Sequence, residues 1–222
     1  MEKLIDSKTG NKVKEILEEV RDSVQLVLIR NESDYSEITQ QLLTELKELN
    51  DKIQVQTYSV TSDEYPYEIE KNLLPAIIIL DSEGNDLGVR FYGIPSGHEF
   101  STLLEDIIAV ANMKIDAFNE ENMKKLYTID KKMRIRVFVT PTCPYCPKAV
   151  YAAHQAALIN PNIIGEMIEA NEFDQLSFEY GVSSVPHTVI EINENGKWIK
   201  KNEFVGAYPE QAFVEEILRA AE

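Results

Sequence analysis

The sequence predicts an α/β fold made of two consecutive units that share one order of helices and strands. Three observations lead to this prediction. Short apolar runs alternate with amphipathic stretches along the whole chain, as expected when strands alternate with helices. The order of these segments in the first half recurs in the second half. Glycine and proline interrupt the pattern at matching places in both halves.

In the first half, apolar residues at helical spacing predict helices, and short β-branched runs predict strands. The predicted helices cover residues 11–21, 33–49, 64–73 and 99–113. The predicted strands cover residues 24–29, 53–58, 76–80 and 87–92. The last two strands are joined by a turn-forming segment, Asp81 to Asn85, so we expect them to form a hairpin.

The second half repeats this order. Its predicted helices cover residues 119–129, 145–159, 172–180 and 211–221, and its strands cover residues 133–139, 163–168, 187–192 and 198–205. Laying Ile29 on Val139 also lays Tyr35 on Tyr145 and brings Pro75 next to Pro186. The sequence therefore predicts two domains, residues 1–116 and residues 117–222, that arose by internal duplication.

The charge of the chain excludes several classes of partner. The formal net charge is −16, which would repel nucleic acid and anionic membrane surfaces. No apolar run is long enough to span a bilayer, and the first residues lack the apolar core of a signal peptide. We therefore expect a cytoplasmic protein that binds neither nucleic acid nor membrane.

The two cysteines, Cys143 and Cys146, lie two residues apart. As a structural staple such a disulfide is weak, because it closes a very small loop and removes little entropy from the unfolded chain. A C-x-x-C pair at a helix start suits redox chemistry, because one thiol has a lowered pKa and the second can close a disulfide. Structural zinc needs four ligands, and only three scattered histidines accompany the cysteines, so we predict no metal.

A resemblance to known proteins follows from two motifs. A strand leads into Thr-Pro-Thr-Cys-Pro-Tyr-Cys-Pro at residues 140–147, and Ser-Val-Pro at residues 184–186 precedes a second strand and hairpin. This pattern resembles the thioredoxin fold. The duplication resembles the archaeal glutaredoxin-like protein disulfide oxidoreductases, which are tandem thioredoxin folds, and is similar to the N-terminal module of the bacterial alkyl hydroperoxide reductase flavoprotein. Many members of the archaeal family carry C-x-x-C in both halves, whereas residues 33–36 here are Ser-Asp-Tyr-Ser. The first unit is therefore predicted to be redox-silent.

The resemblance implies a role for each residue of the motifs. Cys143 is the expected nucleophile at the N-terminus of its helix, and Cys146 the more buried resolving thiol. Pro144 and Tyr145 are expected to tune the pKa and the reduction potential. Val185–Pro186 is expected to form a cis peptide bond that faces the cysteines and exposes backbone for an extended substrate. The redox-active disulfide is the only expected cofactor.

Other candidates have weaker support. Thioredoxins carry a buried carboxylate in the strand before the motif, but the matching position here is Val137. Glu166 or Glu169 could replace it, although we expect each to be a surface charge. His187 follows the predicted cis proline and lies either near the thiols, at the surface or in the core. The remaining histidines, His98 and His154, have no partner pattern and are expected to be solvated.

Together these features predict a thiol–disulfide oxidoreductase that exchanges a dithiol with disulfide-containing proteins. A second possibility is an electron donor to a peroxiredoxin, recharged by a thioredoxin-reductase-like flavoprotein. A third is an oxidase or isomerase of cytosolic protein disulfides, since the motif does not determine redox direction. A non-enzymatic alternative, a substrate-binding scaffold, suits the first unit better than the second. Dependence on glutathione stays open, because glutaredoxins also use C-P-Y-C.

Overall fold

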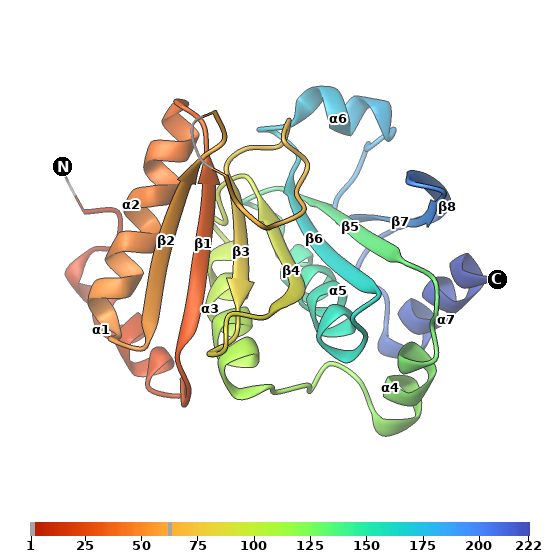
Figure 1. The fold of residues 1–222 in the computed structure, drawn as a ribbon, viewed down its shortest axis with the longest axis horizontal. Helices are drawn as coiled ribbons and strands as arrows, with labels where there is room; N and C mark the ends of the chain where they lie inside the picture. The colour runs from red at the N-terminus through yellow and green to blue at the C-terminus, as the bar shows by residue number, and fades with distance from the viewer. Residues whose placement is uncertain (1–2, 62–63) are drawn as a thin grey trace.

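The computed structural model describes residues 3–61 and 64–222, and its strands form a single mixed sheet. Met1 and Glu2, which belong to the predicted first unit, lie outside the described residues. The strand order is β2-β1-β3-β4-β6-β5-β7-β8, as Figure 1 shows from left to right. The strands are β1 (Val24–Arg30), β2 (Ile53–Ser59), β3 (Ala76–Leu80), β4 (Asp86–Tyr92), β5 (Met133–Val139), β6 (Ile163–Glu169), β7 (His187–Glu194) and β8 (Lys197–Val205).

The two halves of the sheet repeat one pairing pattern. Strand β1 is parallel to β2 and antiparallel to β3, and β3 pairs antiparallel with β4. In the same way, β5 is parallel to β6 and antiparallel to β7, and β7 pairs antiparallel with β8. This repetition confirms the predicted pair of tandem units. A parallel pairing of β4 with β6 joins the units into one sheet, and the boundary between residues 116 and 117 stays a prediction.

Most of the helices cover one face of this sheet, behind the strands in Figure 1. Leu26 and Leu28 of β1 enter this helical core, whereas Val27 and Ile29 point to the opposite face, as the alternation of a strand requires. All four are fully buried, so both faces of the sheet are covered. The helices are α1 (Ser7–Leu17), α2 (Asp34–Leu49), α3 (Glu99–Asn112), α4 (Glu120–Tyr127), α5 (Cys146–Ile159), α6 (Asp174–Glu179) and α7 (Glu210–Ala221).

The predicted helix over residues 64–73 is wrong. Residues 64–70 have no regular secondary structure, and we call residues 64–74 the strap, because they run across the front of the sheet in Figure 1. Tyr65, Tyr67 and Ile69 alternate along the strap and pack against the face that the helices leave uncovered. The rings of Tyr65 and Tyr67 lie 6.1 and 6.2 Å from that of Tyr58. The apolar period of this segment is two, and Pro66 disfavours a helix at its start.

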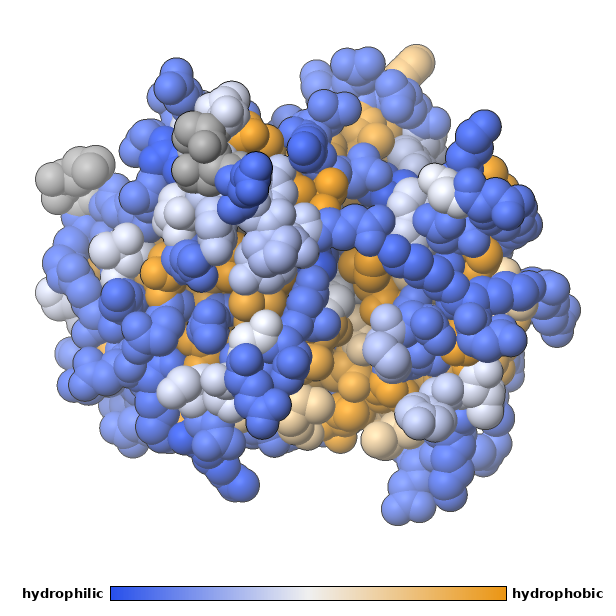
Figure 2. All heavy atoms as spheres, in the orientation of Figure 1, coloured by the Kyte–Doolittle hydropathy of each residue, from blue (hydrophilic) through white to orange (hydrophobic). Residues whose placement is uncertain are grey.

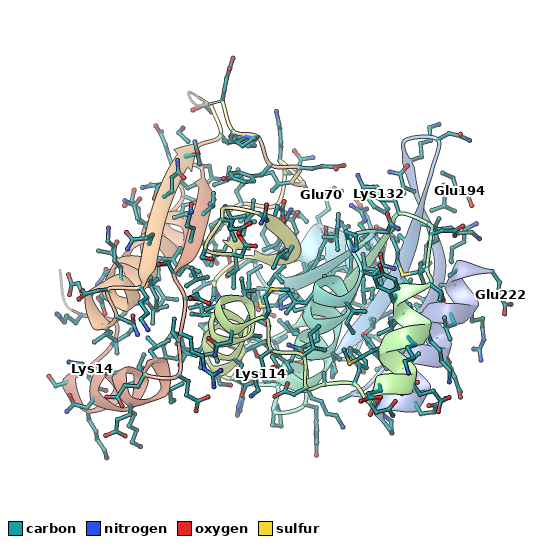
Figure 3. The ribbon with its side chains drawn as sticks, turned by 60° about the horizontal axis from the view of Figure 1, so that its bottom comes forward. Lys14, Glu70, Lys114, Lys132, Glu194 and Glu222 are labelled. Atoms are coloured by element: carbon teal, nitrogen blue, oxygen red, sulfur yellow. A yellow bond between two sulfur atoms is a disulfide. The ribbon has the colours of Figure 1, made fainter. Side chains whose placement is uncertain are left out.

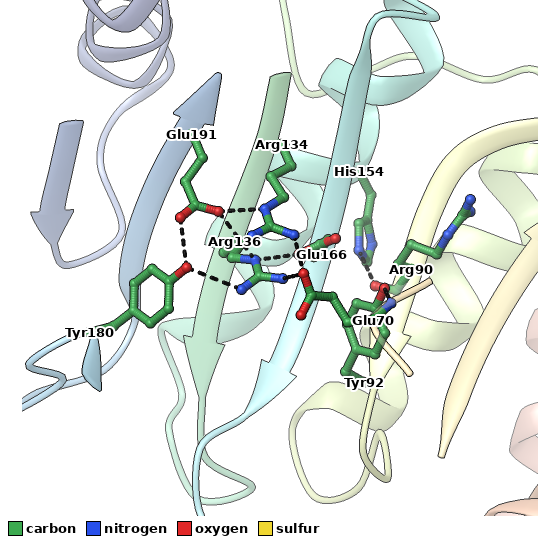
Figure 4. Close-up of polar contacts among 9 residues, drawn as sticks. All are labelled: Glu70, Arg90, Tyr92, Arg134, Arg136, His154, Glu166, Tyr180 and Glu191. Carbon is green, nitrogen blue, oxygen red and sulfur yellow. Dashed lines mark hydrogen bonds and ion pairs between the residues drawn. The ribbon is translucent and has the colours of Figure 1, made fainter. Parts of the chain in front are cut away.

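The strap also crosses from the first unit to the second through its acidic residues. Glu68 lies 2.7 Å from Lys132, and Glu70 contacts both Arg134 and Arg136 on β5. Figure 3 labels Glu70 and Lys132 close together on this side of the molecule, and Figure 4 shows the contacts of Glu70. The strap therefore ties the two units together with charge pairs.

Figure 2 shows hydrophilic residues over most of the visible face, as the charge of the chain leads one to expect. Hydrophobic residues show through mainly near the centre of that face. Among the described residues, no helix has the length and apolar character needed to cross a membrane.

Candidate active site

Cys143 and Cys146 form a disulfide where β5 meets α5. Strand β5 ends at Val139, and the amide of Cys143 closes a turn by donating to the carbonyl of Thr140 at 3.1 Å. Helix α5 begins at Cys146, so Cys143 precedes the helix rather than starting it. The backbone amide of Cys146 donates to the Cys143 sulfur at 3.1 Å. This amide and the positive end of the helix dipole both favour a thiolate at Cys143.

The surroundings of the two sulfurs differ. Cys143 is 7% exposed and Cys146 is fully buried. Tyr145 between them is 69% exposed, so an aromatic ring stands at the rim of the site. Pro144 lies ahead of the helix, not at its first position, and Pro147 lies in the first turn as predicted. Access and helix geometry thus favour Cys143 as the sulfur that meets a substrate.

The Val185–Pro186 peptide bond is cis, as the resemblance implied. Val185 is half-buried and packs against the helical core that contains both cysteines, and Pro186 is buried. The carbonyl of Pro186 accepts a hydrogen bond from the amide of Gly206 at 2.8 Å. The role of this dipeptide in substrate binding stays a prediction.

The first unit contains an oxygen counterpart of the cysteine site. Ser33 caps α2, and the amide of Ser36 donates to the Ser33 hydroxyl oxygen at 3.3 Å, just as the Cys146 amide donates to the Cys143 sulfur. The side-chain oxygen of Asn31 accepts from both serine hydroxyls, at 2.6 and 2.8 Å. Leu74–Pro75 is also cis. The sequence alignment of the two motifs is therefore correct in space.

The start of α3 lies directly against the turn that carries the cysteines. The amide of His98 donates to the carbonyl of Pro141 at 3.0 Å. At Gly97, whose φ is +60°, an added Cβ would lie 2.1 Å from the same carbonyl oxygen. Only glycine allows this close approach of two backbones. The first residue of α3, Glu99, is thereby brought beside the active-site turn.

Helices α3 and α5 run side by side in the same direction. Their starts meet at the His98–Pro141 hydrogen bond, and their middles meet where Asp106 lies 2.6 Å from His154. Just beyond the end of α3, the carbonyl of Lys114 accepts from the side-chain amide of Gln155 at 3.0 Å. Glu99 lies about two turns before Asp106, and the first turn of α5 lies about two turns before His154. Glu99 is therefore level with Cys146.

Glu99 is the functional candidate that sequence reasoning missed. Its side chain is buried, and its Oε2 accepts a hydrogen bond from the Thr102 hydroxyl at 2.8 Å. Its Oε1 is buried without a hydrogen-bond partner among the described residues. Burial raises the pKa of Glu99 to about 7. One signal was available in the sequence, because Glu99 lies on the same helical stripe as the apolar residue Leu103.

The expectation that Glu166 and Glu169 are surface charges is wrong. Both side chains are buried, with exposed fractions of 3% and 4%. Glu166 accepts from Nε of Arg136 at 2.7 Å, on the face of the sheet opposite to the cysteines. Glu169 accepts from the amide of Glu172 at 2.6 Å, and burial raises its pKa. Each carboxylate is thus held by contacts of its own.

The histidines also separate. His98 is exposed as expected, whereas His154 is fully buried, so the prediction that it is solvated is wrong. His187 is buried beside Phe138, with the ring centroids 6.3 Å apart, and contacts Glu203 at 3.1 Å. Phe138 points away from the face that carries the cysteines, so His187 is not a neighbour of the thiols. Within the described residues, no group of three or more His, Cys, Asp or Glu side chains is arranged to hold a metal ion.

Comparisons with known proteins agree with this architecture. A model of the thioredoxin domain matches residues 133–219. A domain of the alkyl hydroperoxide reductase flavoprotein component from Enterococcus faecalis superposes with a TM-score of 0.83 and 27% identity, covering 96% of this chain and 99% of that one. A protein disulfide oxidoreductase from Aeropyrum pernix gives 0.82 and 27%, covering 98% and 94%.

The chain is a tandem thioredoxin-fold protein. Its relatives include a protein disulfide oxidoreductase and the same component of alkyl hydroperoxide reductase in other bacteria. The reductase component from Pseudomonas aeruginosa is 28% identical over 185 residues, which cover 82% of this chain. The one from Staphylococcus aureus is 24% identical over 87% of this chain. The chain spans 33% and 35% of the lengths of these two relatives.

Proposed function

We propose that this tandem thioredoxin-fold chain is a protein thiol–disulfide oxidoreductase that works through Cys143 and Cys146. The observation that carries the proposal is the disulfide at the start of α5, with the Cys146 amide directed at the Cys143 sulfur. A sulfur that accepts an N–H bond at a helix start is a stabilised thiolate after reduction, and therefore a good nucleophile and leaving group. The relatives with redox names support the same activity.

The reaction proceeds in two exchanges. The Cys143 thiolate attacks one sulfur of a substrate disulfide, forming a mixed disulfide and releasing the other substrate sulfur as a thiolate. The Cys146 thiol then loses its proton and attacks Cys143. This step forms the Cys143–Cys146 disulfide and releases the second substrate sulfur, which takes up a proton. The substrate disulfide gains two electrons, and the cysteine pair loses them.

Glu99 is our candidate for the group that accepts the proton of Cys146. It is level with Cys146 on the neighbouring helix, and it is buried. A base is most effective when its pKa lies near the working pH, and the pKa of Glu99 is about 7. Glu99 then fills the place that Val137 leaves without a carboxylate in β5.

The substrate segment is expected to lie extended beside Val185 and Pro186. Backbone pairing at such an edge recognises a polypeptide without regard to its sequence. The exposed Tyr145 ring and the residues of the silent unit near Pro141 then form the remaining walls of the site. No cofactor beyond the disulfide is needed, because electrons pass as thiol pairs.

A direct test is the reduction of insulin disulfides in the presence of dithiothreitol. The wild-type chain should accelerate the reaction, and Cys143→Ser should remove the acceleration. Cys146→Ser should accumulate a mixed disulfide with the substrate, because the second exchange cannot occur. Ser33→Ala provides the matched control in the silent unit and should keep full activity. An unchanged rate in Cys143→Ser would refute the mechanism.

A second candidate function is delivery of electrons from a thioredoxin-reductase-like flavoprotein to a peroxiredoxin. The likeness to a component of alkyl hydroperoxide reductase favours it. In this role the chain is a cytoplasmic carrier between two partners. Peroxide-dependent consumption of reduced nicotinamide, in a mixture of the three proteins, tests it. Consumption that is the same without this chain excludes the role.

The reduction potential distinguishes reduction from oxidation or isomerisation. Equilibration of the Cys143–Cys146 couple with glutathione buffers gives the value. A potential near about −270 mV supports a reductase, and one above about −180 mV supports an oxidase or isomerase.

A further inference from the structure

A buried pair of ionisable side chains bridges the two units directly behind the active site. Asp106 comes from α3 of the first unit, and His154 comes from α5, the helix that begins with Cys146. The His154 Nδ1 lies 2.6 Å from the Asp106 Oδ2, and both side chains are at most 1% exposed. Burying such a pair costs several kcal/mol per charge, and well-packed apolar residues often replace one without loss of stability. Packing alone therefore gives no reason for this pair.

The hydrogen bonds determine how many protons the pair holds. The His154 Nε2 lies 3.0 Å from the carbonyl oxygen of Arg90, a contact drawn in Figure 4. A carbonyl only accepts, so Nε2 carries a proton. The short contact between Nδ1 and the carboxylate then holds a second proton. The pair therefore keeps one proton more than a neutral imidazole and a carboxylate would hold separately.

The groups that face this pair are few. Glu99 lies on the same stripe of α3, about two turns before Asp106. Glu105, also on α3, is exposed, and the Tyr151 hydroxyl on α5 donates instead to Asp116 at 2.8 Å. The guanidinium of Arg90 on β4 contacts Asp86, on the other face of the sheet. A protonated His154 ring thus favours the charged form of Glu99, and Asp106 and Glu105 oppose it.

We propose that the His154–Asp106 pair holds a positive imidazolium beside Glu99 and so sets how readily Glu99 accepts the proton of Cys146. His154 and Asp106 are positioning residues, because they act through Glu99 and touch no substrate. The silent unit then takes part in the chemistry, because it supplies both Glu99 and Asp106. The inference rests on the proposed oxidoreductase function and adds a means of setting its pH range.

Asp106→Asn tests the proposal with little change in shape. The amide can still donate to Nδ1 of His154, but the ring then needs no second proton and becomes neutral. Glu99 loses a nearby positive charge, so the acid limb of the reductase rate should move to higher pH by at least ~0.5 pH unit. His154→Gln removes the same positive charge and should shift the limb in the same direction.

A second readout needs no substrate. The ultraviolet absorbance of the thiolates in the reduced protein, followed against pH, should move with the rate limb in both variants. If the wild type reduces no disulfide, the proposed function fails, while this titration still tests the pair. If the wild type is active but neither profile moves in the variants, the pair is only structural.

The control variant removes a different carboxylate near the same strand. Asp86→Asn breaks the contact with Arg90 on the far face of the sheet, so it should lower stability without moving either pH profile. Should Asp106→Asn fail to fold, nitrogen NMR of the wild-type His154 ring decides the matter. A ring that carries both protons at pH 7 supports the proposal, and a neutral ring overturns it.

Discussion

Glu99 differs from the two cysteines in how it reaches the active site. The cysteines are placed by the local chain, through the turn after β5 and the start of α5. Glu99 is placed by tertiary structure, through the contact of His98 with Pro141 and the packing of α3 on α5. The motif and the cis bond before Pro186 could therefore be predicted from the sequence, whereas Glu99 and His154 could not.

We predict that Glu99→Gln makes the protein more stable but slower. The folded-state pKa of about 7 lies above the ordinary value of 4.5, so the stabilisation that this group contributes is present below pH 4.5 and is lost as pH rises through 7. At pH 8 the variant should gain roughly 1–3 kcal/mol in the free energy of unfolding. Urea denaturation at pH 5 and pH 8 measures the difference.

The same variant should slow the second exchange by roughly a hundredfold, the lower end of what a positioned proton acceptor contributes. Rapid-quench detection of the mixed disulfide measures this step by itself. Thr102→Val, which removes only the hydroxyl that donates to Glu99, serves as the conservative comparison and should have the smaller effect. Equal rates in wild type and Glu99→Gln would exclude Glu99 as the acceptor.

At the scale of elements, the strap takes the place of a helix in the first unit. Its alternating aromatic residues resemble a strand, while its length and charge pattern resemble a helix, so the sequence alone was ambiguous. What decides is the uncovered face of the sheet, which the strap buries, and the buried arginines of β5, which it pairs. A reading of local periodicity contains neither fact. The hairpins and most helices, in contrast, lie close to their predicted ranges.

We predict that Glu70→Gln loosens the strap far more than Glu68→Gln does. Glu70 contacts Arg134 and Arg136, which are almost fully buried, so its loss leaves buried cations without a partner. The expected loss of stability is about 1–3 kcal/mol, against at most about 0.5 kcal/mol for Glu68, whose pair with Lys132 is exposed. Urea denaturation of the two variants gives the comparison, and equal losses would contradict it.

The Glu70 contribution should also depend on pH. Burial raises its pKa, but Arg136 and Arg134 outweigh burial and hold the pKa below its ordinary value of 4.5. The stabilisation is therefore present above pH 4.5 and is lost as pH falls through the lowered folded-state pKa. The difference in unfolding free energy between wild type and Glu70→Gln should shrink in acid and stay constant from pH 6 to pH 8.

At the scale of the whole molecule, the two units share one sheet and one helical layer. Strands β4 and β6 pair in parallel, and α3 packs on α5 across the same line. The repeat and its order could be read from the sequence, but the joining of the units could not, because no local pattern specifies which strand edges meet. A chain cut near residue 117 would expose the β6 edge and one side of α5.

We predict that Gly165→Ala destabilises the whole molecule. Gly165 lies in β6 under α5, and an added Cβ would lie 2.5 Å from the carbonyl oxygen of Ala153. The catalytic helix must move away from the sheet to make room, at a cost of about 1–3 kcal/mol. Gly10→Ala is the matched control, because its new methyl meets only side chains, the nearest at 3.7 Å, and should stabilise α1 by about 0.5–1 kcal/mol. Thermal unfolding compares them.

The serine pair of the first unit bears on electron capacity. With one dithiol in 222 residues, the chain holds two electrons at a time and must be reloaded after every disulfide that it reduces. The Ser36 amide already faces the Ser33 side chain as the Cys146 amide faces Cys143. Ser33→Cys with Ser36→Cys should therefore double the number of thiols titrated after reduction and turn a single-charge carrier into a two-charge reservoir. The duplication in this chain has enlarged the surface that serves each electron pair, and two oxygen-to-sulfur exchanges separate it from a molecule that stores twice as much.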